Sequence, residues 1–239
     1  MPHATLRLYA ELNGYLGRDR RQRDILLALE GPCPARHLVE RCGVPHTEVE
    51  LLLRNGRPVD LEEPVAPGDR LAVYPPFVRL APDDSAVRPR RPPGPARFFA
   101  DAQLGRLARH LRLLGFDTLY EHDIADAELV ERAAHEARIV LSRDRDLLIR
   151  RDVRYGCHLR VDDPREQLDR VLARYALAGE AKPFTRCMEC NGELHEVLKS
   201  ELAAELDPRT WQCFDAFWRC EGCGRIYWRG SHYERLRTR

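Results

Sequence analysis

Two pairs of closely spaced cysteines stand out near the C-terminal end of this 239-residue chain. Two residues separate Cys187 from Cys190, and two separate Cys220 from Cys223. Four thiolates in such pairs can form the tetrahedral site that zinc prefers in structural positions. The segment between the pairs is longer than the about 15–20 residues of the simplest template, so we expect a helical insertion in it. We interpret the pairs as a structural zinc site, with two disulfides or a redox-active pair as the alternatives.

Acidic residues form the second group with chemical potential. Asp101, Asp144 and Asp146 follow expected strands, and Asp126 opens an expected helix. In an open α/β sheet, ligands bind outside the carboxyl ends of the strands, so these side chains should gather at one edge. Carboxylates brought together repel one another unless a hard cation such as Mg²⁺ or Mn²⁺ lies between them. The pattern predicts a metal site able to hydrolyse phosphodiesters.

Each acid also has a purely structural interpretation. Asp126 is a good helix N-cap whether or not it binds metal. Asp144 and Asp146 can form surface ion pairs with neighbouring arginines. Asp123 can end a strand in a turn, and Asp162 can begin the last helix of the segment. The case for a metal site therefore depends on the set and not on any single member.

Composition places the chain among globular proteins with more than one modest core. It is 44% hydrophobic and 32% charged, with a formal net charge of +1. No apolar run is long enough to cross a bilayer, and residues 1–10 lack the features of a secretory signal, so we expect a cytoplasmic protein with reduced thiols and no membrane partner. Arginines gather at residues 88–97, 143–160 and 219–239. These clusters are either a nucleic-acid surface or solvated faces.

The chain divides into three expected domains and a linker. Five prolines between Ala81 and Pro95 indicate a stiff, extended linker, and Gly179 and Pro183 mark a second boundary. The expected units are 1–80, a linker at 81–96, 97–179 and 180–239.

The first unit has the order β-β-α-β-β. The expected elements are strands at 5–9, 24–29, 50–54 and 70–74, a helix at 35–42 and a tight turn at Asn55-Gly56. This order, with the segment Pro67–Pro76, resembles the ubiquitin-like sulfur carriers of molybdopterin and thiamine synthesis. Those carriers end in a free Gly-Gly, whereas this chain continues through Phe77–Leu80. We therefore interpret the unit as a binding or packing module whose removal leaves the chemistry of the next unit intact.

The second unit alternates strand and helix, which is typical of a parallel sheet covered by helices. The expected strands are 97–100, 118–120, 139–141 and 158–161, and the expected helices are 103–114, 126–137 and one that begins at Pro164.

Long motifs in this unit resemble a known family. Phe98–Thr118 and Leu141–Leu147 resemble the RNase domain at the C-terminus of the Mut-seven exonucleases, a branch of the PIN nucleases. Phe217–Cys220 and Gly224–Tyr233 resemble the zinc ribbon fused to that domain, and bacterial members with a ubiquitin-like front domain match the whole layout. The resemblance implies an N-terminal ubiquitin-like β-grasp domain, a central PIN-like parallel α/β sheet and a C-terminal zinc ribbon.

The resemblance also implies roles for particular residues. Asp101, Asp126 and Asp144 fall on the acidic positions of the family, with Asp146 a further member and Asp123 or Asp162 an additional ligand. Ser142 stands where a threonine is usual, so the hydroxyl is kept. The implied function is a metal-dependent ribonuclease with Mg²⁺ or Mn²⁺ at Asp101, Asp126 and Asp144 and with structural zinc. The implied partner is RNA, and the ribosome or RNA-processing proteins are further candidate partners. Phosphates would be held by Arg106, Arg143, Arg145 and Arg229.

Two questions about the C-terminal unit stay open in the sequence. Its aromatic residues either stack unpaired bases or fill the core of the ribbon; they are Trp218, Tyr227, Trp228 and Tyr233. His232 can replace a cysteine as ligand, although four thiolates already complete the shell.

Other functions compete with the ribonuclease. One is a non-catalytic RNA- or ribosome-binding adaptor with a degenerate central sheet. Another is a toxin-like nuclease that acts on one structured RNA.

Overall fold

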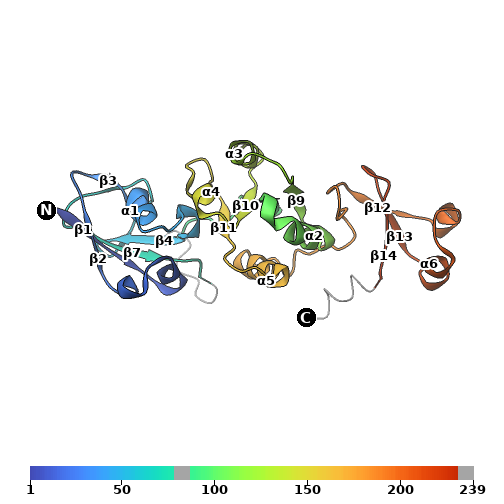
Figure 1. Ribbon diagram of the computed structural model, residues 1–239, viewed down its shortest axis with the longest axis horizontal. Helices are drawn as coiled ribbons and strands as arrows, with labels where there is room; N and C mark the ends of the chain where they lie inside the picture. The colour runs from blue at the N-terminus through green and yellow to red at the C-terminus, as the bar shows by residue number, and fades with distance from the viewer. Residues whose placement is uncertain (78–86, 231–239) are drawn as a thin grey trace.

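A computed structural model describes residues 1–77 and 87–230 of the chain. Sheets of five, four and three strands form three units that follow one another along the long axis of the molecule (Figure 1). The N-terminal sheet domain lies at one end and the unit with the paired cysteines at the other, so the central parallel sheet has a neighbour on each side. Among the described helices, none combines the length and apolar character needed to cross a bilayer.

The N-terminal domain is built on a mixed sheet in the order β2-β1-β7-β4-β5. Its strands are β1 (His3–Leu8), β2 (Ile25–Ala28), β4 (Leu51–Arg54), β5 (Arg57–Pro58) and β7 (Arg70–Tyr74). The pair β1–β7 is parallel and the other pairs are antiparallel. Helix α1 (Ala35–Arg41) covers one face through Leu38 and Val39, which join the buried alternate residues of β1 in one core. The predicted strands and helix of this domain are confirmed.

The turn between β4 and β5 is also as predicted. Asn55 and Gly56 have positive φ angles of 51° and 81°, a region that Asn and Gly tolerate best. A separate short pair joins β3 (Cys33–Pro34) to β6 (Pro64–Val65).

The chain that follows this domain is not a free spacer where it is described. Residues 78–86, which include much of the expected linker, lie outside the described residues. Beyond them, the Arg88 amide donates to the Glu50 carbonyl at 2.9 Å, and the Arg90 side chain pairs with the Glu50 carboxylate at 2.8 Å. Arg88 and Arg90 thus hold the described part of the linker on the N-terminal domain, and Arg90 also donates to the Arg174 carbonyl of the central unit at 3.1 Å.

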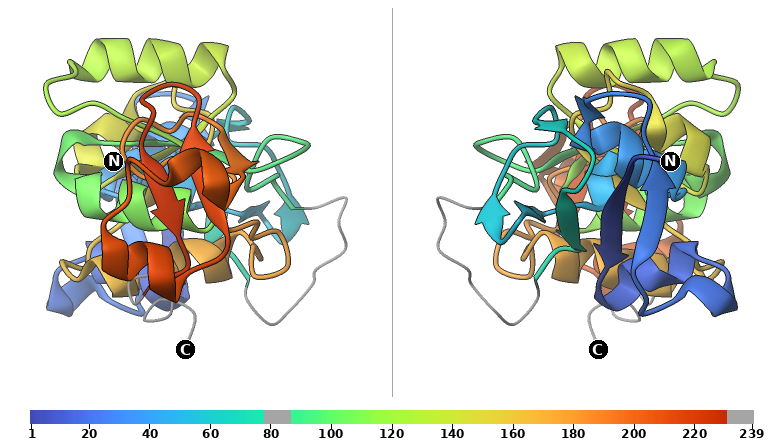
Figure 2. Two further views of the ribbon diagram at one scale, coloured as in Figure 1. Left: turned by 90° about the vertical axis from the view of Figure 1, so that its right-hand side faces the viewer. Right: turned by 90° about the vertical axis from the view of Figure 1, so that its left-hand side faces the viewer.

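The central unit is a fully parallel sheet in the order β11-β10-β8-β9. The strands are β8 (Arg97–Ala100), β9 (Asp117–Tyr120), β10 (Ile139–Ser142) and β11 (Gly156–His158), and the helices are α2 (Gly105–Leu113), α3 (Asp126–His135), α4 (Arg145–Ile149) and α5 (Pro164–Arg174). Helices α3 and α5 lie on opposite sides of the sheet (Figures 1 and 2). Phe98 packs with α2 and α5 on one face, and Phe99 packs with α3 and α4 on the other. The predicted parallel sheet covered by helices is confirmed.

Two details of this unit differ from the prediction. The last strand ends at His158 and not at Val161, because its partner β10 ends at Ser142, the residue opposite His158. The sequence does not predict helix α4, because five residues are too few to show a helical period.

The chain order of the strands reverses between β8 and β10. From β8 the chain crosses through α2 to β9 on one side, and from β9 it crosses through α3 to β10 on the other side. Such a switch point leaves a crevice at the carboxyl ends of the two strands, which is where doubly wound proteins bind ligands.

The C-terminal unit is an antiparallel sheet of β12 (Leu194–Val197), β13 (Phe217–Cys220) and β14 (Ile226–Trp228). Between the cysteine pairs lie a 3-10 helix at Lys199–Leu202 and helix α6 (Pro208–Cys213), so the predicted helical insertion is confirmed. Asp207 caps α6 by accepting the amides of Arg209 and Thr210, each at 3.0 Å.

Candidate active site

Asp101 lies at the switch point, directly after β8. Its amide donates to the Leu141 carbonyl of β10 at 2.9 Å, which holds the end of β8 against its neighbour. Its Oδ1 accepts the amide of Ala102 at 2.6 Å and caps the 3-10 helix Ala102–Leu104. Its Oδ2 accepts the hydroxyl proton of Ser142 at 2.6 Å. With 8% of its surface exposed, Asp101 is a buried carboxylate held on both oxygens.

Asp144 is joined to Asp101 through Ser142. The Asp144 amide donates to the Ser142 hydroxyl oxygen at 2.8 Å, and that hydroxyl donates to Asp101. The Asp144 Oδ1 accepts the amide of Asp146 at 2.8 Å and so caps α4. One hydroxyl thus ties the carboxyl ends of β8 and β10 together and fixes the first turn after β10.

Asp126 does not cap its helix. It is the first residue of α3, Ala125 occupies the N-cap position, and no side chain makes a capping bond there. The capping interpretation of Asp126 is therefore wrong, and its side chain is exposed near the amide end of the helix, where a negative charge is favourable.

The remaining acids are exposed. Asp146 pairs with Arg145 at 2.7 Å, as the surface interpretation expected, and 72% of its side chain is exposed. Asp162 pairs with Arg143, and Asp123 lies at 3.9 Å from the ring of His122 with 95% of its side chain exposed. None of the three is held as firmly as Asp101.

Ligand atoms of three or more metal-binding side chains lie within 4.8 Å of one another at two places in residues 1–77 and 87–230. One place is the four paired cysteines, and the other is Glu193, His195 and Glu221. The carboxylates of Asp101, Asp126 and Asp144 are not gathered to that distance, since Asp144 is turned toward the amide of Asp146. What the fold brings together is Asp101, Ser142 and the backbone of Asp144.

A cavity of about 450 Å³ lies between the first turns of α2 and α5, and Ala102, the residue after Asp101, lines it. Arg106, Arg143 and Asp162 line it together with Tyr120 and Arg109. Arg109 and Tyr120 were not singled out in the sequence, although Arg109 lies one helical turn beyond Arg106 and so shares its face.

The other two expected arginines lie elsewhere. Arg145 pairs with Asp146 at the start of α4. The Arg229 guanidinium lies over the rings of Phe184 and Trp218, at 5.8 and 5.7 Å from their centroids, in the C-terminal unit. Two of the four expected phosphate-binding arginines, Arg106 and Arg143, thus line one cavity.

The four paired cysteines form the second candidate site. Sγ of Cys187 lies 3.6 Å from Sγ of Cys223, and Sγ of Cys190 lies 3.4 Å from Sγ of Cys220. In a tetrahedron with zinc–sulfur bonds of about 2.3 Å, neighbouring sulfurs lie about 3.8 Å apart, so the cluster matches that size. All eight cysteines of the chain are free thiols, which is contrary to the disulfide interpretation.

The backbone around the cluster is shaped to fit it. A Cβ at Gly192 would lie 3.0 Å from Sγ of Cys220 and 3.3 Å from Sγ of Cys190, so a larger side chain would press on both sulfurs. The donor set and its enclosure fit a zinc ion.

Protonation of the thiols differs within the cluster. Burial disfavours the Cys187 thiolate, but the amide of Cys190, the hydroxyl of Tyr227 and the amide of Glu189 outweigh it and lower the pKa of Cys187 to about 7. Burial and the neighbouring sulfurs raise the pKa of Cys190 to about 12. A metal ion that replaced these protons would release them on binding.

The aromatic residues of this unit pack within it. Trp218 stacks on Phe184 with centroids 4.3 Å apart, and the Tyr227 hydroxyl lies 3.0 Å from Sγ of Cys187. The ring centroid of Trp228 lies 6.2 Å from that of Phe214 and 6.4 Å from that of Phe217. These contacts favour a core role over base stacking. Tyr233 and His232 lie outside the described residues.

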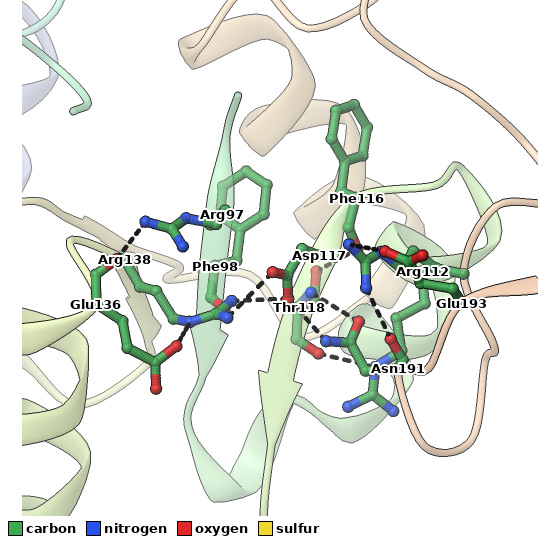
Figure 3. Close-up of polar contacts among 11 residues, drawn as sticks. Arg97, Phe98, Arg112, Phe116, Asp117, Thr118, Glu136, Arg138, Asn191 and Glu193 are labelled. Carbon is green, nitrogen blue, oxygen red and sulfur yellow. Dashed lines mark hydrogen bonds and ion pairs between the residues drawn. The ribbon is translucent and has the colours of Figure 1, made fainter. Parts of the chain in front are cut away.

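Asn191, which follows the first cysteine pair, joins the C-terminal unit to the central sheet (Figure 3). Its Nδ2 donates to Asp117 Oδ1 at 2.7 Å, and its Oδ1 accepts the Thr118 amide of edge strand β9 at 3.0 Å. Asp117 is held from the other side by Arg138, at 2.8 and 3.1 Å. Although burial opposes ionisation, Arg138 and Asn191 lower the pKa of Asp117.

Arg112 makes a second connection at this junction. This buried side chain of α2 donates to the carbonyls of Met188 and Glu189, between the first two cysteines, at 3.0 and 2.7 Å, and to the Thr118 carbonyl at 2.8 Å. The turn that presents Cys187 and Cys190 is therefore fixed on the central unit.

Comparison with known proteins places the chain in a family. Residues 96–239 match the model of the Mut7-C RNAse domain, and residues 1–81 match the model of the Mut7-C ubiquitin domain. No curated protein matches the chain. The crystal structure of H. volcanii small archaeal modifier protein 1 is similar to 32% of this chain over 100% of its own length, at 21% identity and a TM-score of 0.27. Because the first model matches more than half of the residues, the chain belongs to the Mut7-C RNAse domain family and carries a Mut7-C ubiquitin domain at its N-terminal end.

Proposed function

We propose that this protein is a metal-dependent ribonuclease whose central unit is a PIN-like domain, flanked by a β-grasp domain and a zinc ribbon with the boundaries expected above. The observation that carries the proposal is the pairing of Asp101 with the Ser142–Asp144 turn at the switch point of the parallel sheet. The family match to an RNAse domain supports it.

The acidic edge supplies the donors that a hard cation requires. Asp101, Asp126 and Asp144 would hold Mg²⁺ or Mn²⁺, with Asp146 near the last of them, because carboxylate oxygens suit these ions. When bound, such an ion activates a water molecule and stabilises the leaving oxygen of a phosphodiester. Ser142 keeps Asp101 oriented, and Asp126 is available because it does no capping.

The cavity between the first turns of α2 and α5 offers a path for the RNA backbone. Arg106, Arg109 and Arg143 line it, and guanidinium groups match the geometry of phosphate. We propose that this cavity receives a phosphate next to the one that is cleaved.

The cysteine cluster is proposed to hold one structural zinc ion. Four thiolates leave no open position for a water molecule, so the site would serve folding and not catalysis. Asn191 connects it to strand β9 and Arg112 connects it to helix α2, so the site would also support the central unit.

Cleavage of a labelled single-stranded RNA by the full-length protein with Mn²⁺ or Mg²⁺ tests the proposal. Asp101→Asn and Asp144→Asn should abolish cleavage while RNA binding persists. Asp169→Asn is the matched control, because this acid on α5 of the same unit is exposed and is not a candidate ligand. Binding without cleavage in the parent protein, over varied RNAs and both metals, would favour the adaptor function.

A further inference from the structure

The N-terminal domain is joined to the central unit by hydrogen bonds that are largely buried. Glu48 Oε2 pairs with the Arg174 side chain of α5 at 2.9 Å, and Glu48 Oε1 accepts the His158 amide of β11 at 2.8 Å. The ring of His46, also buried, donates from Nε2 to the Val153 carbonyl at 2.8 Å. Breaking this junction would leave buried charged and polar groups unpaired, so the two units are held in one arrangement.

One contact of this junction leads to the candidate active site. The Tyr15 hydroxyl lies 2.8 Å from Nδ1 of His158, and Nε2 of His158 lies 3.2 Å from the Arg143 carbonyl oxygen. A carbonyl only accepts, so Nε2 must carry the proton; Nδ1 of the neutral ring then accepts from the Tyr15 hydroxyl. Burial lowers the pKa of His158, which agrees with a neutral ring.

Tyr15 is itself fixed in this position. It ends the 3-10 helix Ala10–Tyr15, and the Arg160 guanidinium lies over its ring, 4.8 Å from the centroid. The preceding residue, Gly14, permits this approach, since a Cβ there would lie 2.5 Å from Nη2 of Arg160.

The end of this chain of bonds is the turn that carries the acids. Arg143 follows Ser142, which bonds Asp101, and precedes Asp144. His158 is opposite Ser142 in the sheet. The carbonyl of Arg143 is therefore held from the N-terminal domain, while the residues on either side of it shape the acidic edge.

We propose that Tyr15 is a positioning residue of the ribonuclease site: through His158 it orients the Arg143 carbonyl and with it the Ser142–Asp144 turn. The N-terminal domain is then a part of the nuclease and not a separable module, contrary to the expectation from the sequence. This inference rests on the proposed function.

Tyr15→Phe in the full-length protein tests it, because the change removes one hydroxyl and leaves the Glu48 and His46 contacts in place. We expect kcat for RNA cleavage to fall about tenfold with KM unchanged, because loss of an outer-shell partner of a metal ligand typically lowers activity by at least that factor. Tyr9→Phe is the matched control, since Tyr9 stacks on Tyr74 within the N-terminal sheet. It should leave kcat unchanged.

His158→Gln provides the second arm, because an amide in the place of Nε2 can still donate to the Arg143 carbonyl without help from Tyr15. In this background Tyr15→Phe should cost no further activity. An additional tenfold loss there, or equal losses in Tyr15→Phe and Tyr9→Phe, would overturn the proposal.

A spectroscopic measurement separates this inference from the proposed function. This measurement uses nitrogen NMR spectra recorded without RNA. In Tyr15→Phe, the Nδ1 signal of His158 should move from its position in the parent toward that of an unprotonated ring nitrogen without a hydrogen bond. A parent protein without cleavage would refute the ribonuclease. An active parent with normal kcat in Tyr15→Phe, or an unshifted Nδ1, would refute the role of Tyr15.

Discussion

Ser142 on β10 donates its hydroxyl proton to Oδ2 of Asp101 on β8 at 2.6 Å, across the switch point of the parallel sheet. The same hydroxyl accepts the Asp144 amide, so one buried oxygen determines how two acids of the candidate site are presented.

Removal of the Ser142 hydroxyl should reduce activity by more than any loss of stability would explain. Ser142→Ala leaves Oδ2 of Asp101 without its donor, and we expect a loss of roughly 10- to 100-fold in metal affinity or cleavage. Ser142→Thr keeps the hydroxyl and should retain most of the activity. Titration of Mn²⁺ into both variants, followed by cleavage assays, measures the difference. Equal behaviour of the two variants would show that the hydroxyl has no such role.

The junction of the C-terminal unit can be tested with two similar asparagines. Asn191 and Asn55 both have positive φ angles. Each side chain bonds an aspartate and the backbone amide of the residue that follows that aspartate. Asn191 is buried, whereas Asn55 is exposed. Asn191→Asp places a second carboxylate against Asp117, so we expect the C-terminal unit to lose about 1.5–3 kcal/mol of stability. The matched change Asn55→Asp should cost much less, because water screens an exposed pair.

Urea unfolding followed by tryptophan fluorescence is a suitable measurement, because the three tryptophans of the chain all lie between residues 211 and 228. A loss in Asn191→Asp no larger than in Asn55→Asp would argue against the junction.

Zinc should be present at one ion per chain and should hold the C-terminal unit together. We expect Cys190→Ser to lose the metal, whereas Cys213→Ser, a change at another exposed cysteine outside the cluster, should keep it. Elemental analysis gives the content, and a strong chelator should unfold the unit as seen by tryptophan fluorescence. Full zinc content in Cys190→Ser would exclude the four-cysteine site.

The stability of the protein should fall in mildly acidic solution. Burial lowers the pKa of His158 below its ordinary value of 6.5, and the charges of Arg160 and Arg145 act in the same direction, against Glu48 and the Arg143 carbonyl. Below about pH 6.5 the unfolded chain therefore binds more protons than the folded chain, and the free energy of unfolding decreases as the pH falls.

Denaturant unfolding at pH 7.5 and 5.5 measures this dependence. His110 contributes in the same direction, because burial also lowers its pKa. The pH dependence should thus become weaker, without vanishing, in His158→Gln. An unchanged dependence in that variant would show that His158 is not responsible.

Much of the architecture could be predicted from local patterns. The strands of the central sheet show as short apolar runs before acids, and Gly115 and Pro164 mark helix boundaries. The spacing of the paired cysteines predicts the four-cysteine cluster. Helix α4 is too short to show a period in the sequence. The cap and first-turn interpretations of Asp126 cannot be separated by pattern, because both positions favour the same residue type.

The junctions between units could not be predicted. His46, Glu48 and Tyr15 are separated by more than 100 residues from their partners in the central unit, and nothing in their local sequence indicates those partners. The same holds for Asn191, whose bonds to Asp117 and Thr118 depend on the packing of an edge strand against a cysteine turn. Long-range polar contacts of this kind become visible only in the folded chain.

Cleavage of single-stranded RNA by the parent protein and by Asp101→Asn, with and without Mn²⁺, tests the central claim most directly. Asp101→Asn keeps the size of the side chain but replaces one of its two accepting oxygens by a donor, so thermal unfolding is used to check that the variant is folded. We predict metal-dependent cleavage in the parent and none in the folded Asp101→Asn protein. Undiminished cleavage by Asp101→Asn would contradict the account.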